Sequence, residues 1–361
     1  MPRIRNLDNP DELRAAEAAE LDWVGGAPTA APASRVRDVL LIPTSTAEGD
    51  WNAHPPVSSP PVDLGRGLKL TELDHDEAEL VMNACTPRGH YFFAVRQFGG
   101  LYAFVLDVAL DVYEQHHFNW DADGVIITAL QLSRVVRDNG HSPEFAARIV
   151  EHEDGQKQVI PQGQHYFSFL PTFRLRDDRD WLTAAEAREL RSLLDAYWAN
   201  MDTLPRQLAR AISLSEGAVH QSTLERALVT LFMGLEALLN TGKHQVTKQI
   251  TKRMPLLAAD VGVADISKTF ARTMYADRSS PAHGQELDLP PATRTGQATR
   301  TSDIDPDYLA KVARIQDLLR AAARKGIEDP AFAANVADVA SIRARWPVTS
   351  RVGLLRRRVQ L

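Results

Sequence analysis

Apolar residues recur at helical spacing through most of the second half of the chain. Thr183 and Glu186 form a capping box, the Ser/Thr-x-x-Glu signature of a helix start, and apolar residues three and four apart follow it. The same spacing predicts further helices at 204–214, 223–240, 246–259, 266–277 and 307–324. We therefore expect an all-α bundle over residues 179–328.

The apolar residues in the first half of the chain follow a pattern typical of strands. Apolar runs bounded by Gly, Asp and Asn predict strands at 39–42, 68–73, 91–98, 125–132 and 165–175. Residues 101–113 fit either a strand or a helix, and the acidic residues after Asp74 are typical of a first helical turn. These patterns predict an α+β protein with a mostly β N-terminal domain over 36–178. A loosely ordered segment over 1–35 and a basic tail over 329–361 flank the two domains.

An arginine and a histidine stand close together at the end of one predicted helix. Residues 275–284 read Tyr-Ala-Asp-Arg-Ser-Ser-Pro-Ala-His-Gly, with Arg278 five positions before His283. Arginine presents a permanent cationic fork to phosphate, and histidine exchanges protons near neutral pH. Residues five apart on a helix point about 140° away from each other. Pro281, however, is expected to break the helix at Ser280, and the resulting turn could bring the two side chains together.

The spacing alone also fits a structural role, in which a buried arginine and a capping histidine fasten the helix end. A second pair, Arg134 and His141, shows a similar spacing and lacks the preceding helical pattern. We interpret that pair as accidental.

Three features within 206–324 together resemble the ApeA-like HEPN domain, the C-terminal module of certain bacterial defence proteins. They are, in chain order, a helix over 224–239 ending in Leu-Glu236-Ala-Leu, Arg253 before a small apolar cluster within 250–257, and the pattern Tyr-x-x-Arg-Ser-x-x-x-His-Gly. The last pattern matches at Tyr275, Arg278, Ser279, His283 and Gly284. Pro281 and Ala282 depart from it, because larger apolar residues are expected there.

The resemblance implies a HEPN helical bundle that commonly forms a homodimer and cleaves RNA without a metal or another cofactor, leaving a cyclic phosphate. By position, Arg278 would hold the scissile phosphate and His283 would act as general base or general acid. Ser279 would orient the phosphate, and Glu236 would pair with Arg278 or with Arg253. A non-catalytic HEPN adaptor that binds RNA or a partner protein is the alternative.

The amino-acid composition is compatible with both the nuclease and the adaptor and does not decide between them. The formal charge of −6 requires any RNA contact to be local. Cys85 is the single cysteine, which excludes an internal disulfide and fits a reducing cytosol. Apolar runs of membrane-spanning length are absent. We expect a cytoplasmic chain with no membrane contact.

Other candidate chemistry is weaker. The group His116, His117, Asp121 and Asp123 includes adjacent histidines, which would face opposite sides of a strand and not share a metal. The sequence contains no Gly-x-Ser-x-Gly and no His-Glu-x-x-His motif. The arginines of the 329–361 segment form either a solvated tail or an arm that contacts phosphates. The resemblance therefore implies an RNA-cleaving defence or toxin effector whose N-terminal domain responds to an unknown trigger, with the adaptor as the alternative.

Overall fold

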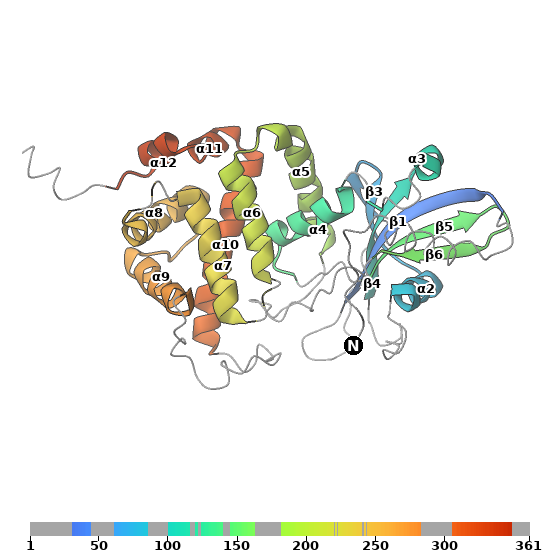
Figure 1. Ribbon diagram of the computed structural model, residues 1–361, viewed down its shortest axis with the longest axis horizontal. Coiled ribbons are helices and arrows are strands. Elements are labelled where there is room, and N and C mark those ends of the chain that lie inside the picture. The colour runs from blue at the N-terminus through green and yellow to red at the C-terminus, as the bar shows by residue number, and fades with distance from the viewer. Residues whose placement is uncertain are drawn as a thin grey trace, which may run out of the picture.

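The computed structural model describes residues 31–44, 61–85, 100–115, 120–121, 124–139, 145–162, 182–219, 221, 223–239, 242, 244–282 and 305–348. Within these ranges an antiparallel sheet lies toward the N-terminus and helices fill the C-terminal part (Figure 1). This mixed architecture is compatible with the predicted α+β class. The segment 1–30 and the predicted strands at 91–98 and 165–175 lie outside the described residues.

The described strands form one sheet of order β2-β3-β4-β1-β5-β6. Their bounds are β1 Ala33–Thr44, β2 Val62–Gly65, β3 Leu68–Glu72, β4 Gly100–Val108, β5 Phe145–His152 and β6 Lys157–Pro161. The central strand β1 pairs antiparallel with both β4 and β5, so Leu40 stands opposite Phe104 on one side and Ala146 on the other. Burial on both faces explains why β1 reads as a continuous apolar run.

Alternate residues of the sheet enter two separate cores. Leu40 and Phe104 pack with helical residues such as Ile126 and Leu190. Residues of opposite parity, such as Leu41, pack against helix α2 (His75–Cys85) on the other face. Asp74 caps α2 by accepting the Glu77 N–H at 2.9 Å, which confirms the helix start predicted there.

The helices of the C-terminal part surround one long helix. Their bounds are α5 Ala184–Asn200, α6 Arg206–Val219, α7 Leu224–Leu239, α8 Val246–Val261, α9 Lys268–Ala282, α10 Pro306–Glu328, α11 Pro330–Asn335 and α12 Val339–Arg345, with a short 3₁₀ turn, η3 Met201–Thr203, after α5. The capping box of Thr183 and Glu186 is present with both of its bonds. Helix α10 contacts α5, α6, α7, α8 and α11. It passes so close to α6 that a Cβ on Gly326 would lie 2.3 Å from Leu208 Cδ2, so any larger residue there would force the Leu208 side chain to move.

The prediction of a strand at 125–132 is wrong, because these residues belong to helix α4 (Val125–Val136). The β-branched run Val-Ile-Ile-Thr suggested a strand, yet the buried positions also fit helical spacing. Asp121 begins the helix by accepting the N–H groups of Ile126 and Ile127, both at 2.9 Å. The ambiguous segment 101–113 divides into β4 and a short helix, α3 (Leu110–Gln115).

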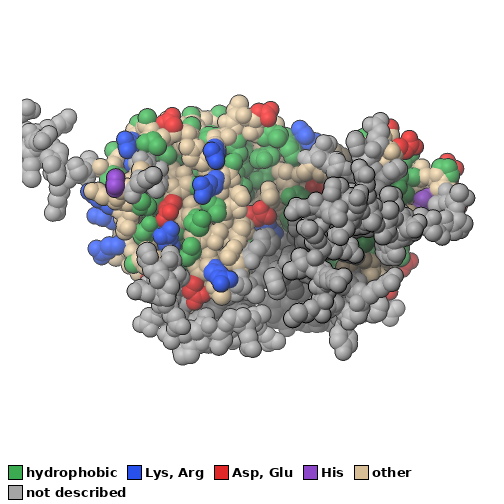
Figure 2. All heavy atoms as spheres, viewed as in Figure 1, with side chains coloured by type: hydrophobic (Ala, Val, Ile, Leu, Met, Phe, Trp, Pro, Cys, Tyr) green, Lys and Arg blue, Asp and Glu red, His purple; other side chains and the backbone are tan. Residues whose placement is uncertain are grey.

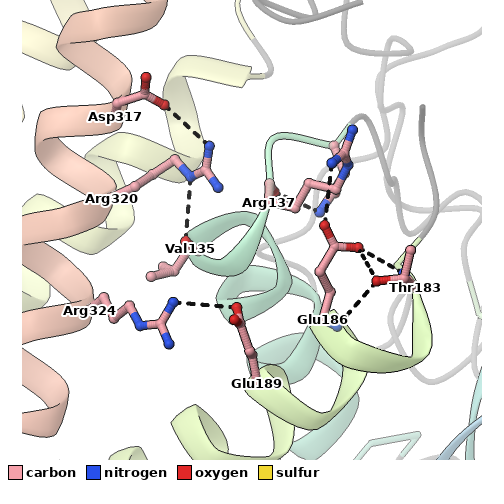
Figure 3. Close-up of polar contacts among 9 residues, drawn as sticks. Val135, Arg137, Thr183, Glu186, Glu189, Asp317, Arg320 and Arg324 are labelled. Carbon is pink, nitrogen blue, oxygen red and sulfur yellow. Dashed lines mark hydrogen bonds and ion pairs between the residues drawn. The ribbon is translucent and has the colours of Figure 1, made fainter. Parts of the chain in front are cut away.

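Helix α4 joins the sheet-bearing part to the bundle, since it packs on α5, α6 and α10. Arg320 of α10 donates from Nε to the Val135 carbonyl at the end of α4, at 3.4 Å (Figure 3). Arg134 is buried and lies 2.9 Å from Glu216 of α6. Arg134 therefore fastens two helices together, and His141 lies outside the described residues.

The first part of the predicted basic tail is folded, which corrects the expectation of a tail from residue 329. Helices α11 and α12 lie against the bundle, and Trp346 after α12 is only 1% exposed. Its ring packs edge-on against Phe332 at 6.2 Å between centroids. Apolar anchors set among the arginines therefore hold this segment down, and residues 349–361 lie outside the described residues.

A buried charged cluster ties α2 to the sheet. Arg37 of β1 binds both carboxylate oxygens of Glu77, at 2.6 and 3.1 Å, and Lys157 of β6 lies 2.6 Å from Glu77 Oε1. The hydrogen bonds from Arg37 outweigh the effect of burial and lower the pKa of Glu77 to about 2.

We expect this cluster to make stability fall in acid. The folded pKa of Glu77 lies below its ordinary value of 4.5, so the stabilisation is complete above about pH 4.5 and is lost as the pH falls toward 2. The shift corresponds to about 3 kcal/mol. Urea unfolding between pH 7 and pH 3 should give Glu77→Gln a lower free energy of unfolding than wild type. This difference should be largest at pH 7 and should shrink as the pH falls. Glu79→Gln, an exposed change on the same helix, should unfold like wild type at every pH. If the free-energy difference between Glu77→Gln and wild type stays constant across pH, the lowered pKa of Glu77 is contradicted.

Candidate functional site

Helices α7, α8 and α9 meet around Tyr275. Its ring packs edge-on against Phe232 of α7 at 5.5 Å between centroids, and the residue is 5% exposed. The Tyr275 hydroxyl donates to Glu236 Oε1 at 2.9 Å, and Thr247 of α8 lies close to the same phenol. Tyr275 therefore links three helices at one point.

Arg278 completes this cluster from the next turn of α9. Its Nη2 lies 3.1 Å from Glu236 Oε1, the oxygen that also accepts the Tyr275 hydroxyl. Its guanidinium carbon is 5.4 Å from the centre of the Tyr275 ring, within reach of a cation–π contact. The side chains of Arg278 and Glu236 are 18% and 21% exposed, so the pair is partly buried and still reachable from solvent.

The protonation state of Tyr275 follows from its surroundings. Burial and then the bond to Glu236 raise the pKa of Tyr275 to about 12. The phenol therefore remains a hydrogen-bond donor at neutral pH and keeps Glu236 in place beside Arg278.

The Arg278 guanidinium does not use all of its donors within the cluster. Its Nε is buried and has no hydrogen-bond partner among the described residues. A guanidinium offers five N–H donors in a fixed plane, and an anion with several oxygens can accept two of them at once. The cluster therefore holds a partly exposed cation in a defined position.

The expected helix break at Ser280 is not observed, because α9 continues through Pro281 to Ala282. A proline removes one amide donor, and in the last turn this affects only the bond to the Asp277 carbonyl. Helix α8 likewise contains Pro255. His283 follows the last helical residue and lies outside the described residues, so its distance to Arg278 is not part of the described geometry.

The other supporting residues have separate contacts. Ser279 donates its hydroxyl to the Tyr275 carbonyl at 3.0 Å, within α9. Arg253 lies outside the cluster, 2% exposed, and donates to the carbonyls of Trp346 at 2.9 Å and Leu239 at 2.6 Å. Of the two partners considered for Glu236, the structure pairs it with Arg278.

Two members of the cluster were missed in the sequence. Phe232 stands four residues before Glu236, at a spacing that places both on one side of α7, so this partner of Tyr275 could have been inferred. Thr247 begins α8 with no motif around it, and only the packing of α8 on α9 brings it to Tyr275.

Other kinds of site have less support in the described part of the chain. Within it, no three His, Cys, Asp or Glu residues come together as metal ligands. The helices described there are too short or too polar for any of them to cross a membrane. Comparisons with protein family models, curated proteins and solved structures found no match to this chain.

Proposed function

We propose that the protein is a metal-independent endoribonuclease of the HEPN type that acts in the cytoplasm as an antiviral defence or toxin effector. One observation carries the proposal. Arg278, the arginine of the HEPN-like motif, is held in a partly buried cluster by Glu236 and Tyr275, which also belong to the features that resemble HEPN. An arginine at a simply solvated helix end would not need an ion pair and an aromatic contact to hold it in place.

Each residue then has a chemical role. Arg278 binds the scissile phosphate and stabilises the negative charge that grows on its oxygens. The ribose 2′-oxygen attacks phosphorus, and the bond to the 5′-oxygen breaks. His283 either takes the 2′-hydroxyl proton or returns a proton to the leaving oxygen. Glu236 and Tyr275 are positioning residues for Arg278, and Ser279 stabilises the last turn of α9.

A homodimer through the helical bundle fits this chemistry, because one Arg-His pair cannot bind phosphate and also supply both an acid and a base. A two-fold interface doubles the available groups. Met233, 38% exposed and one turn before Glu236 on α7, offers apolar surface beside the cluster for such a contact. The sheet-bearing part is then free to respond to a trigger.

The chemistry itself tests this function. RNA cleavage by the purified full chain should be unchanged in EDTA, because the proposed mechanism uses only side chains. The products should carry a 2′,3′-cyclic phosphate, detected by mass spectrometry. DNA of the same sequence should resist cleavage because it lacks the attacking hydroxyl. Loss of cleavage in EDTA, or equal cutting of DNA, would refute the mechanism.

The adaptor alternative also has an observation in its favour. Glu236 already balances the charge of Arg278, and Tyr275 completes a small closed network. Such a network is stable without a substrate and would suit a protein that binds RNA or a partner and does not cut. Absence of cleavage of any RNA by a folded wild-type chain would favour this function.

A further inference from the structure

One carboxylate oxygen, Glu236 Oε1, is shared by two donors of the candidate site. The Tyr275 hydroxyl donates to this oxygen at 2.9 Å, and Arg278 Nη2 lies 3.1 Å from it. Tyr275 and Arg278 stand three residues apart on α9, so their side chains leave the same side of that helix. The two donors therefore form a small oxygen-binding site on α9, and a carboxylate from α7 fills it.

A phosphate oxygen would satisfy the same two donors. Like a carboxylate oxygen, it carries negative charge and accepts strong hydrogen bonds from a guanidinium and from a hydroxyl. Burial and then the bond to Glu236 raise the pKa of Tyr275 to about 12, so the phenol keeps the proton that it donates. Glu236 thus makes the contacts that the phosphate group of a substrate would need.

The Glu236 carboxylate can leave this position without any movement of the helices. Among the described residues its hydrogen-bond and ion-pair partners are Tyr275 and Arg278, and both of them bind Oε1. The Glu236 side chain is 21% exposed, so a change of its rotamer would carry the carboxylate into water. The two donors would stay in place, because the Tyr275 ring packs on Phe232 and the Arg278 guanidinium lies over the Tyr275 ring.

The charge of the whole chain makes this carboxylate unfavourable for RNA binding. The formal charge is −6, and on the face shown in Figure 2 Asp and Glu side chains lie among the Lys and Arg side chains of the bundle. RNA binding by such a chain depends on local cations. A carboxylate bound to one of these cations competes with the phosphate for the same donors, and its negative charge repels the phosphate.

We propose that Glu236 is an internal competitor of the RNA phosphate, which closes the site in the free protein and is displaced when RNA binds. This inference rests on the proposed RNA substrate and adds a self-inhibitory contact to its site. Tyr275 gains a second role, because its hydroxyl passes from the carboxylate to the phosphate. A ligand opens the site only if it gains more from the two donors than Glu236 does.

Removing the charge of Glu236 tests the proposal through the direction of the effect. Glu236→Gln keeps an oxygen that can accept from Tyr275 and Arg278, and it lacks the charge that competes with phosphate. The matched control is Glu225→Gln, which removes the same charge three turns earlier on α7, about 16 Å along the helix axis. At about 0.1 M salt that distance exceeds the range of an unscreened charge.

The affinity of the full chain is measured by fluorescence anisotropy with a 2′-O-methyl oligouridine, which cannot be cut because its 2′-oxygen is blocked. Glu236→Gln should bind this RNA about fivefold more tightly than wild type, because an ion pair of this kind no longer has to be broken. Glu225→Gln should stay within about twofold of wild type. Tyr275→Phe, which keeps the ring, should bind about fivefold or more weakly, because it loses a hydrogen bond to a charged oxygen.

Three results would overturn the proposal. If Glu236 serves only to position Arg278, Glu236→Gln will bind RNA as weakly as wild type or more weakly. Equal tightening by Glu225→Gln would show a general effect of net charge. Tyr275→Phe that binds like wild type would show that the hydroxyl does not pass to the phosphate. Thermal unfolding of each variant confirms that it is folded, and an unfolded chain would not produce the tighter binding expected of Glu236→Gln.

Cleavage by wild type separates this inference from the proposed nuclease. If wild type cuts RNA and Glu236→Gln does not bind more tightly, the nuclease stands and the internal competitor is wrong. If wild type does not cut and Glu236→Gln binds more tightly, the internal competitor stands and the adaptor function replaces the nuclease. Absence of binding by wild type and Glu236→Gln alike overturns the inference, whatever the cleavage result.

Discussion

RNA cleavage should fall by about a thousandfold or more when either Arg278 or His283 is replaced by alanine. Removing one group that stabilises developing charge typically reduces turnover by about 10²–10³-fold, and removing a general acid or base by about 10²–10⁴-fold. Arg278→Lys should fail largely as well, because lysine keeps the charge and loses the fork that engages two oxygens. Single-turnover cleavage of a labelled RNA would measure all three variants, and Arg210→Ala, an exposed change on α6, is the control.

The stability of these variants decides what a loss of activity means. Arg278→Ala removes an ion pair and packing over the Tyr275 ring, while Glu236 keeps its bond from the tyrosine hydroxyl. We expect a destabilisation of about 1–2 kcal/mol, too small to unfold the chain at 25 °C. An inactive Arg278→Lys that unfolds at the wild-type temperature would establish a chemical role. If His283→Ala unfolds the protein, His283 is a structural cap.

The free energy of unfolding should fall by about 4 kcal/mol in Arg253→Met. Arg253 is 2% exposed and joins three parts of the bundle, through the Leu239 carbonyl of α7, Gln249 of its own helix and the Trp346 carbonyl after α12. Methionine fills much of the volume but leaves two buried carbonyls without these donors, at a cost of about 1–3 kcal/mol each. Urea unfolding measures the loss, with the exposed Lys268→Met as control.

Limited proteolysis would locate the effect. Arg253→Met should release α11 and α12 first, because the Trp346 carbonyl loses its partner, so cleavage after Arg343 or Arg345 by trypsin should speed up about tenfold or more. A variant as stable as wild type that has lost RNA cleavage would instead place Arg253 in the catalytic chemistry, as the motif allowed.

The local sequence pattern predicted the helices around the candidate site. It could not predict which side chains contact each other across those helices. The apolar spacing of α7, α8 and α9 was sufficient to locate each helix within a few residues. The partner of Arg253, by contrast, is Trp346, 93 residues away, and nothing near either residue signals the contact. The choice of Arg278 over Arg253 as the partner of Glu236 likewise depends on how three helices pack.

Two of the predictions made from the sequence are wrong for the same physical reason. The run at Val125 has β-branched residues that favour a strand, and burial against α5 and α10 overrides that preference to give α4. The arginines after residue 329 suggested a solvated tail, and Phe332 and Trp346 among them anchor two helices. In both places tertiary packing outweighed local composition.

The position of β1 in the middle of the sheet affects how the protein must be made. Asp38 on β1 forms an ion pair with Arg148 on β5, which is synthesised 110 residues later. At about 5–20 residues per second, the ribosome needs roughly 5–20 s to supply that stretch. During this time the central strand of the sheet has an open edge, the state in which nascent chains aggregate or recruit chaperones. The sheet can close well before Arg278 is synthesised, so a ribosome-bound chain would hold a finished N-terminal sheet while the cluster around Arg278 is still incomplete.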